Sequence, residues 1–142
     1  MNNNSRKRSF AFVMILVFIL MSTSCENRSD KIRRELNDGI RANYATKFDL
    51  AIKHFEKVIS WDENNKEAYL NMGRVYFNTK NTKKSMESYN MALSIDSTFG
   101  EAYKSRAQLY FLLGDRDLSC RDYLKAEKYG IPNLYNYTKF CK

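Results

Sequence analysis

The chain has 142 residues, a formal net charge of +8, one histidine and three cysteines. Its Lys and Arg residues are interleaved with Asp and Glu instead of forming a basic block, so the charge indicates a solvated surface and argues against a nucleic-acid-binding protein. His54 is the only histidine and no motif places a Ser or Cys beside it, so a Ser-His-Asp or Cys-His catalytic site is not expected.

Residues 1–24 have the layout of a secretory signal peptide. Arg6, Lys7 and Arg8 form a basic start, and residues 10–21 are an apolar run of about 12 residues. A membrane-spanning helix needs about 20 apolar residues. Because the run is shorter, we expect export and cleavage, with a retained membrane anchor as the alternative. Cleavage removes three basic residues and no acidic ones, which lowers the formal charge by three from +8.

Cys25 follows the apolar run, directly after the small residue Ser24. This arrangement resembles the signal of bacterial lipoproteins, in which the cysteine becomes the acylated first residue of the mature chain. The resemblance implies lipidation at Cys25, a membrane-anchored protein in the bacterial cell envelope, and a lipidated N-terminus and polar tether over residues 25–31. Ser22 stands where the common pattern has Leu. An ordinary signal peptide followed by an incidental cysteine is the alternative.

Beyond residue 31 the sequence repeats itself every 34 residues. Residues 69–92 contain two amphipathic runs on either side of a polar turn, and this stretch aligns with the sequence both before and after it. The pattern predicts helical hairpins that stack, because one hairpin cannot bury both of its faces alone. The aligned residues are Tyr69 and Tyr103, Gly73 and Ala107, Tyr76 and Tyr110, Ser85 and Ser119, Tyr89 and Tyr123, and Ala92 and Ala126, preceded by Gly39, Ala51, Phe55 and Val58.

A G-x2-Y element, present at Gly73 and Tyr76, followed by an A-x3-F element at this period resembles the tetratricopeptide-repeat family. The resemblance implies an all-α fold, a right-handed superhelix of three helical hairpins. The first helix is expected to begin at about Ile32. The units are residues 32–65, 66–99 and 100–133, followed by a C-terminal capping helix over residues 134–142.

Small residues predict where the two helices of each hairpin cross, because they let the backbones approach closely. At the turns, Asn81 and Asp115 are candidate helix caps, and Gly114 is placed to stop a helix in the left-handed conformation. The expected small residues are Gly39, Gly73 and Ala107 on the first helices and Ala51, Ser85 and Ser119 on the second helices.

The family resemblance also implies an extended peptide partner in the groove lined by the first helices. Amide side chains there would bind peptide groups, aromatic side chains would add contact area, and cations would bind a carboxylate. An ordinary mixed surface is the alternative. Helical offsets from Gly73 predict groove positions at Leu70, Asn71, Arg74, Phe77 and Asn78, at Lys104, Gln108, Phe111 and Leu112, and at Leu36, Ile40, Asn43 and Tyr44 of the first unit.

Some family members clamp the acidic C-terminal carboxylate of cytosolic chaperones with Lys and Asn of their first unit. Leu36 and Ile40 stand at the matching positions here, so the resemblance does not imply this specificity. Arg74 and Lys104 alone do not rebuild the clamp. Export would also place the chain in a different compartment from those chaperones.

Cys120 and Cys141 are predicted to form a disulfide. Cys120 lies one period after Met86 and two after Ile52, in a column of apolar residues that should pack on the next unit's first helix. Cys141 lies one period after Ala107, in the capping helix that is this next element. Export supplies the oxidising compartment that the bond requires. Two buried free cysteines are the alternative.

The sequence predicts neither a metal site nor a cofactor. The cysteines lack the close pairing of a zinc site, and the five glycines are scattered singly, without a phosphate-binding loop. Asp115, Asp117 and Asp122 are interpreted as a helix cap and a solvated face, not as paired catalytic carboxylates.

The predicted function is therefore non-enzymatic: a membrane-tethered protein–protein interaction module, acting as a scaffold or accessory subunit of a bacterial envelope assembly. The alternative is a soluble periplasmic adaptor that presents a peptide substrate to a separate enzyme. A thiol-disulfide role for Cys120 and Cys141 ranks last, because neither belongs to a CxxC element.

Overall fold

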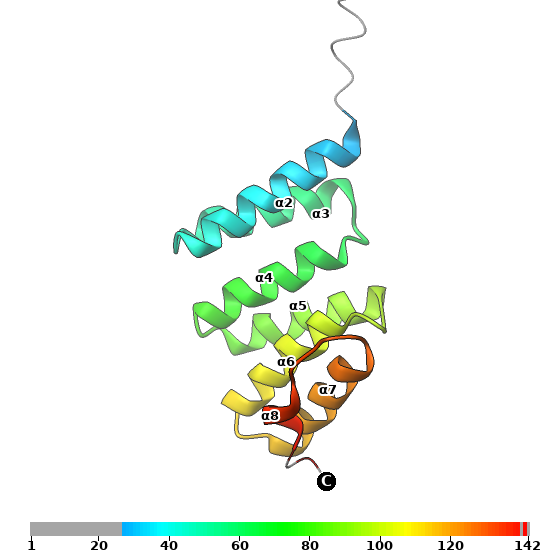
Figure 1. Ribbon diagram of the computed structural model, residues 1–142. Coiled ribbons are helices and arrows are strands. Elements are labelled where there is room, and N and C mark those ends of the chain that lie inside the picture. Colours follow the sequence, from blue (N-terminus) through cyan, green and yellow to red (C-terminus); the bar gives the residue numbers. More distant parts are fainter. Residues whose placement is uncertain (1–26, 140, 142) are drawn as a thin grey trace, which may run out of the picture. The chain divides into compact units, whose positions relative to one another are not determined.

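The computed structural model describes residues 27–139 and residue 141 (Figure 1). The predicted signal peptide and the lipidation site Cys25 lie outside this described part. The chain divides into two units, residues 1–31 and residues 32–142, and the repeated hairpins form the second of them.

Within the described part the regular elements are all helices, which confirms the predicted all-α fold. Consecutive helices pair as three hairpins, α2 with α3, α4 with α5 and α6 with α7 (Figure 1). A short last helix follows. The bounds are α2 (Arg28–Tyr44), α3 (Phe48–Trp61), α4 (Lys66–Asn78), α5 (Thr82–Ile95), α6 (Gly100–Leu112), α7 (Arg116–Lys128) and α8 (Tyr135–Thr138).

The turn inside each hairpin contains a residue in the left-handed region, and these residues are 34 positions apart. They are Thr46 with φ 57°, Lys80 with φ 60° and Gly114 with φ 84°. The prediction for Gly114 is confirmed. At Thr46 and Lys80 a side chain is held in the same conformation at a cost in backbone strain. The left-handed conformation therefore recurs at the same position of each repeat, whether or not that position is a glycine.

Side-chain caps begin two of the helices. Asn81 Oδ1 accepts a hydrogen bond from the backbone N–H of Lys84 at 3.2 Å, as predicted, and Asn65 Oδ1 accepts from Ala68 N at 3.0 Å. Asp115 occupies the cap position of α7, but its side chain makes no cap hydrogen bond. The prediction for Asp115 is thus wrong, because its exposed carboxylate does not bond the first turn of the helix.

The hairpins close on the predicted small residues. A Cβ added to Gly39 would lie 2.5 Å from the ring of Phe55, and one added to Gly73 would lie 2.4 Å from the ring of Tyr89. In the second hairpin the Ser85 hydroxyl donates a hydrogen bond to the Gly73 carbonyl oxygen at 2.9 Å. Each ring thus fills the space that the missing side chain leaves, and the serine joins the two helices at the crossing.

Two clusters of buried side chains form the core. The first lies around Phe55, Val58 and Val75 and joins the first hairpin to α4. The second lies around Tyr89 and Leu109 and continues to the C-terminal segment. Each cluster contains residues from more than one hairpin, including aromatic and small residues that recur every 34 positions. Neighbouring units are therefore packed on each other, as stacking requires.

Both ends of the array differ from the prediction. α2 begins at Arg28, so the residues expected to form the end of a tether are already helical. The expected capping helix over residues 134–142 is only the four-residue α8. Gly130 (φ 88°) and Asn133 (φ 61°) turn the backbone on either side of Pro132. Because Asn133 is left-handed, a helix cannot run through this position, and α8 begins after it.

Candidate functional site

Four of the predicted groove residues, Leu112 among them, lie together. Phe77 near the end of α4, and Gln108 and Phe111 on α6, line one pocket of about 500 Å³. Phe111 is 66% exposed, which is unusual for a large aromatic side chain and leaves its face available for contact. We call this cavity the groove pocket; its lining residues are Phe77, Gln108, Phe111, Leu112, Tyr123 and Tyr137.

Tyr123 and Tyr137 form the part of the groove pocket that the sequence interpretation missed. The ring centroids of these two residues lie 4.8 Å apart, with 20° between the planes, so the rings stack. Tyr123 is buried, whereas Tyr137 on α8 is half exposed. The signal was present in the sequence, because Tyr137 lies one period after Tyr103. The short α8 positions it to close the groove at this end.

Leu70 and Asn71 do not belong to the groove, contrary to the prediction. Leu70 is buried in the second core cluster. Asn71 is also buried, and its Nδ2 donates a hydrogen bond to the backbone oxygen of Glu67 at 2.8 Å. The offset from Gly73 misplaced Leu70, because residues three positions apart on a helix share a face. The face that Leu70 shares with Gly73 is the packed one.

The two predicted cations and Asn78 have different environments. Arg74 Nη2 donates to Glu101 Oε2 at 2.7 Å and its Nε to Ser105 Oγ at 3.3 Å, so its guanidinium joins α4 to α6. Asn78 is exposed and donates to Asn43 Oδ1 on α2 at 3.1 Å. Lys104 is half-buried and forms no ion pair with the described residues. Lys104 is therefore the better candidate for a carboxylate of a ligand.

A disulfide between Cys120 and Cys141 joins α7 to the C-terminal segment. The S–S distance is 2.06 Å and the two Cα atoms lie 5.4 Å apart, as the column of apolar positions predicts. Both cysteines line a second cavity of about 980 Å³ between α7, the end of α6 and the C-terminal segment. We call it the end pocket; it is lined by Phe111, Arg116, Asp117, Ser119, Cys120, Arg121, Tyr123, Leu124, Asn136, Tyr137 and Cys141.

A family model described as tetratricopeptide repeat matches residues 42–109, from the end of α2 into α6. The chain contains tetratricopeptide repeats. Arrays of this kind present an extended surface and typically serve protein–protein interaction. No curated protein matches the sequence.

Solved tetratricopeptide domains have a similar fold. The first TPR of Spaghetti (RPAP3), bound to the HSP90 peptide SRMEEVD, has a TM-score of 0.71 and 22% identity, over 78% of this chain and 90% of that one. The first TPR domain of human RPAP3 has a TM-score of 0.71 and 21% identity, over 76% and 87% of the two chains. The Arabidopsis OM64 TPR domain has 0.70 and 16%, over 80% and 95%. At these identities the likeness concerns the fold alone.

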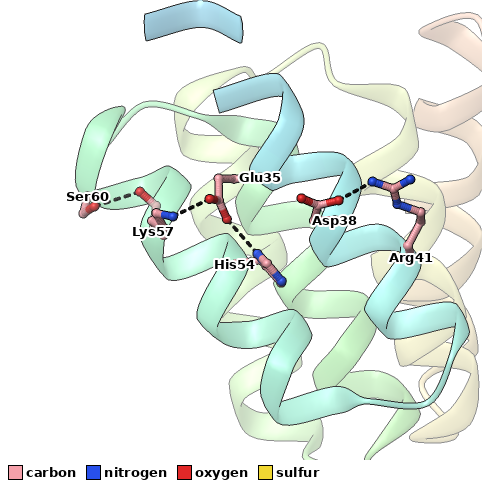
Figure 2. A network of polar contacts seen from close by, with 6 residues as sticks. All are labelled: Glu35, Asp38, Arg41, His54, Lys57 and Ser60. Carbon is pink, nitrogen blue, oxygen red and sulfur yellow. Dashed lines mark hydrogen bonds and ion pairs between the residues drawn. The ribbon is translucent and has the colours of Figure 1, made fainter. Parts of the chain in front are cut away.

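A polar network joins the two helices of the first tetratricopeptide unit (Figure 2). Glu35 Oε2 on α2 lies 2.7 Å from His54 Nδ1 on α3, and Glu35 Oε1 pairs with Lys57. The hydrogen bonds from Lys57 and then from His54 hold the pKa of Glu35 below its ordinary value. Ser60 Oγ donates to the backbone oxygen of Lys57 at 2.7 Å and does not approach His54 (Figure 2). The network thus fastens the hairpin and does not assemble a nucleophile beside the histidine.

Asp122 does not lie on a solvated face, which corrects the interpretation from the sequence. Its side chain is buried, and Oδ2 accepts from Arg106 Nε at 2.6 Å while Oδ1 accepts from Nη2 at 3.0 Å. The third nitrogen of Arg106, Nη1, donates to Asn90 Oδ1 on α5 at 2.7 Å. Asp122 lies on the side of α7 that faces α6, where the two-pronged guanidinium satisfies both carboxylate oxygens.

The described residues contain no group of three His, Cys, Asp or Glu side chains that could hold a metal ion. No described helix is both long and apolar enough to cross a bilayer. Within the same residues, every buried side-chain nitrogen and oxygen has a hydrogen-bond partner. The buried polar groups are therefore engaged in the fold, and the groove pocket and the end pocket are the surfaces to which we assign binding.

Proposed function

We propose that the chain is a non-enzymatic protein–protein interaction module that holds an extended segment of a partner in the groove pocket. The observation that carries this proposal is the joint lining by Phe77 of α4 and by Gln108 and Phe111 of α6. A cavity built from two successive first helices follows the direction in which an extended chain would run across the repeats.

The chemistry of the groove pocket suits a peptide with an apolar or aromatic side chain. The rings of Phe77, Phe111 and Tyr137 supply apolar contact area, and the Gln108 amide can bond a peptide group. Lys104 lies one helical turn before Gln108 and can pair with a carboxylate of the ligand. Large aromatic anchors contribute most of the binding energy at interfaces of this size.

We do not place the anchor of the partner at the positions of the carboxylate clamp in the first unit. Leu36 and Ile40, at the positions of the chaperone clamp, are half-buried and pack against the first core cluster. Apolar side chains at these positions cannot hold a carboxylate. The groove pocket lies in the second and third units, so we place the main anchor there.

The proposed setting is the bacterial cell envelope, where the chain acts as a scaffold or accessory subunit tethered through lipid on Cys25. The basic start, the short apolar run and Ser24-Cys25 support export and lipidation. The Cys120–Cys141 disulfide is consistent with this setting, because such bonds persist in oxidising compartments.

The groove is tested by crosslinked capture of a partner, followed by binding measurements with the peptide segment that is crosslinked. Replacing Phe77 or Phe111 by Ala should weaken binding by about 1 to 2 kcal/mol each. Leu50→Ala is the matched control, because Leu50 is an exposed apolar residue of α3 outside the pocket. A helical circular-dichroism spectrum must be retained. Unchanged affinity in the Phe77→Ala/Phe111→Ala variant would remove the groove assignment.

The tether is tested by mass spectrometry of the membrane fraction. The expected N-terminus is an acylated Cys25, and Cys25→Ala should abolish incorporation of labelled fatty acid. Several acyl chains would anchor the chain firmly, whereas one chain gives only marginal binding. A soluble chain with an unmodified Cys25 would instead favour the periplasmic adaptor.

A further inference from the structure

The end pocket shares Phe111, Tyr123 and Tyr137 with the groove pocket and extends from them to residues of α7 that do not line the groove pocket. α7 offers this pocket two rows of side chains with a spacing of four residues, and such rows run along one side of a helix. The C-terminal segment, fixed by the disulfide, contributes the opposite wall. The rows are Arg116, Cys120 and Leu124, and Asp117 and Arg121.

The repeat geometry leaves room for a helix at this face. In the first two units the second helix packs against the next unit's first helix, α3 against α4 and α5 against α6. These first helices have 13 residues each, about 20 Å of length. Beyond α6 of its own hairpin, α7 meets only α8 among the described helices, and α8 has 4 residues and spans about 6 Å. Most of the corresponding face of α7 is thus not covered by a described helix.

Apolar surface is exposed around this opening. Leu124 is 46% exposed and Phe111 66%, and the neighbouring Leu112 and Leu113 are also more than half exposed. Exposed apolar side chains that cluster at one place mark an interaction surface more often than scattered ones do. An apolar helix face would bury them.

Two unpaired cations border the same opening. Within the described part, the side chains of Arg116 and Arg121 have no hydrogen bond, ion pair or ring contact, whereas each other arginine there has an interaction with another residue. Both arginines are exposed, and Asp117 is the one acidic side chain that lines the pocket with them. A guanidinium with free donors favours a carboxylate ligand.

We propose that the end pocket binds an acidic amphipathic helix of a partner protein, which lies along α7 beside α8. Its apolar residues contact Leu124 and Phe111, and its carboxylates pair with Arg116 and Arg121. This is the helix-in-groove mode of recognition. The proposal can be tested apart from the groove pocket, because Arg116, Arg121 and Leu124 of α7 do not line that pocket.

A second copy of the chain is a poor occupant on charge grounds. Its first helix would be α2, in which Arg28, Lys31, Arg33, Arg34 and Arg41 outnumber the acidic residues. Arginines facing arginines across an interface repel each other. The occupant must carry the opposite charge.

The test uses display of amphipathic helical peptides of about 16 residues, selected on the full-length chain in detergent micelles. The apolar positions are fixed as Leu, and the flanking positions vary among Glu, Gln and Lys. The parent should enrich Glu at the flanks. The best peptide, labelled with fluorescein, should bind Arg116→Gln/Arg121→Gln about tenfold or more weakly than the parent, because two charge-assisted bonds are lost.

Lys53→Gln/Lys83→Gln is the matched control. It removes the same charge from exposed positions of α3 and α5, and should bind the peptide like the parent. Phe77→Ala, at a residue that does not line the end pocket, should also leave this binding unchanged. Melting temperatures should stay constant, since both lysines and both arginines are exposed.

Three results would overturn the proposal. One is a lack of Glu enrichment over Gln on the parent. Another is equal affinity of the acidic peptide for the arginine double variant and the parent. The third is binding of phosphatidylglycerol vesicles that requires Arg116 and Arg121 without any peptide selection, which would assign the arginines to a lipid surface. A peptide that distinguishes the parent from the double variant, and not from the lysine control, supports it.

Discussion

The first and third hairpins fasten their helices from the same repeat position with different chemistry. His54 of α3 and Asp122 of α7 lie two periods apart, and each reaches the first helix of its own hairpin. His54 meets Glu35, whereas Asp122 meets Arg106. These two partners do not align, because Glu35 falls on Tyr103 after two periods. The apolar and small positions thus recur along the repeats, whereas each of these polar contacts occurs in one hairpin only. Such contacts favour the correct pairing of two helices over a pairing shifted by one repeat.

The crossing points of these two hairpins differ as well. Gly39 is packed against the Phe55 ring, whereas the third hairpin has Ala107 at this position. The methyl group of Ala107 occupies space that the ring takes in the first hairpin. Tyr123, two periods after Phe55, stacks on Tyr137.

Breaking the buried ion pair is expected to have the largest effect on stability. Asp122→Ala leaves the Arg106 guanidinium largely buried without its carboxylate, which should cost about 3 to 5 kcal/mol in urea unfolding. Glu35→Ala, in the more open network of the first hairpin, should cost less than about 1 kcal/mol. Equal losses in the two variants would show that the hairpins do not differ as described.

Removing the disulfide separates the third hairpin from the C-terminal segment. Cys141→Ser should lower the free energy of unfolding by about 3 kcal/mol, because the 21-residue separation no longer restricts the unfolded chain. Reduction of the parent with dithiothreitol should lower it by a similar amount and should not affect Cys141→Ser. Two titratable thiols at positions 120 and 141 in the denatured, unreduced parent would contradict the bond.

Exchanging the small residues at the helix crossings of the first and third hairpins tests how tightly each crossing is packed. Gly39→Ala should destabilise by about 2 kcal/mol, because the new Cβ lies 2.5 Å from a ring carbon of Phe55. Ala107→Gly in the third hairpin should cost about 1 kcal/mol, mainly through helix propensity. Thermal unfolding of both variants measures the difference. A stabilising Gly39→Ala would show that the Phe55 ring can move away without loss.

Acid should weaken the first hairpin through Glu35. The pKa of Glu35 is lowered by Lys57 and then His54, and that of Asp96 is lowered to about 2 by hydrogen bonds from Lys66 and then Thr98. A folded-state pKa below the unfolded one means that the stabilisation is complete above the unfolded pKa and is lost as pH falls through the folded one.

Urea midpoints should therefore decline from about pH 4.5 toward pH 2. Glu35→Gln/Asp96→Asn should flatten this part of the curve. Hydrogen exchange should show α2 opening in acid before α6. An unchanged slope in the double variant would exclude these two carboxylates as its source.

The sequence predicted the features of the fold that repeat. The 34-residue period placed the three hairpins, the small seam residues, the left-handed Gly114 and the cap at Asn81, because these positions face the same neighbours in every unit. The column containing Cys120 also pointed to the residue that it bonds. These predictions required only the geometry of an α-helix and the alignment of the sequence with itself at a 34-residue period.

The remaining features depend on contacts that do not repeat. Asp122 finds Arg106 across a hairpin, and no spacing rule pairs them. Leu70 lies in the core, because the packed face of α4 includes more positions than the sequence interpretation assigned to it. α8 begins only after Pro132 and the left-handed Asn133, and it ends at Thr138. Tyr137 was not predicted as a groove residue, since its position depends on the turn that precedes α8.

The Cys120–Cys141 bond also determines how the chain would respond to mechanical force. A pull on the C-terminal end passes through the sulfur atoms into the middle of α7, so the residues between the two cysteines are shielded from the load. Their separation of 21 residues corresponds to roughly 70 Å of extension that stays locked until the bond is reduced. A partner pulling at this end would therefore apply force to the repeat hairpins directly. After reduction of the disulfide, the segment between the two cysteines would extend first, and the force would reach the hairpins only afterwards.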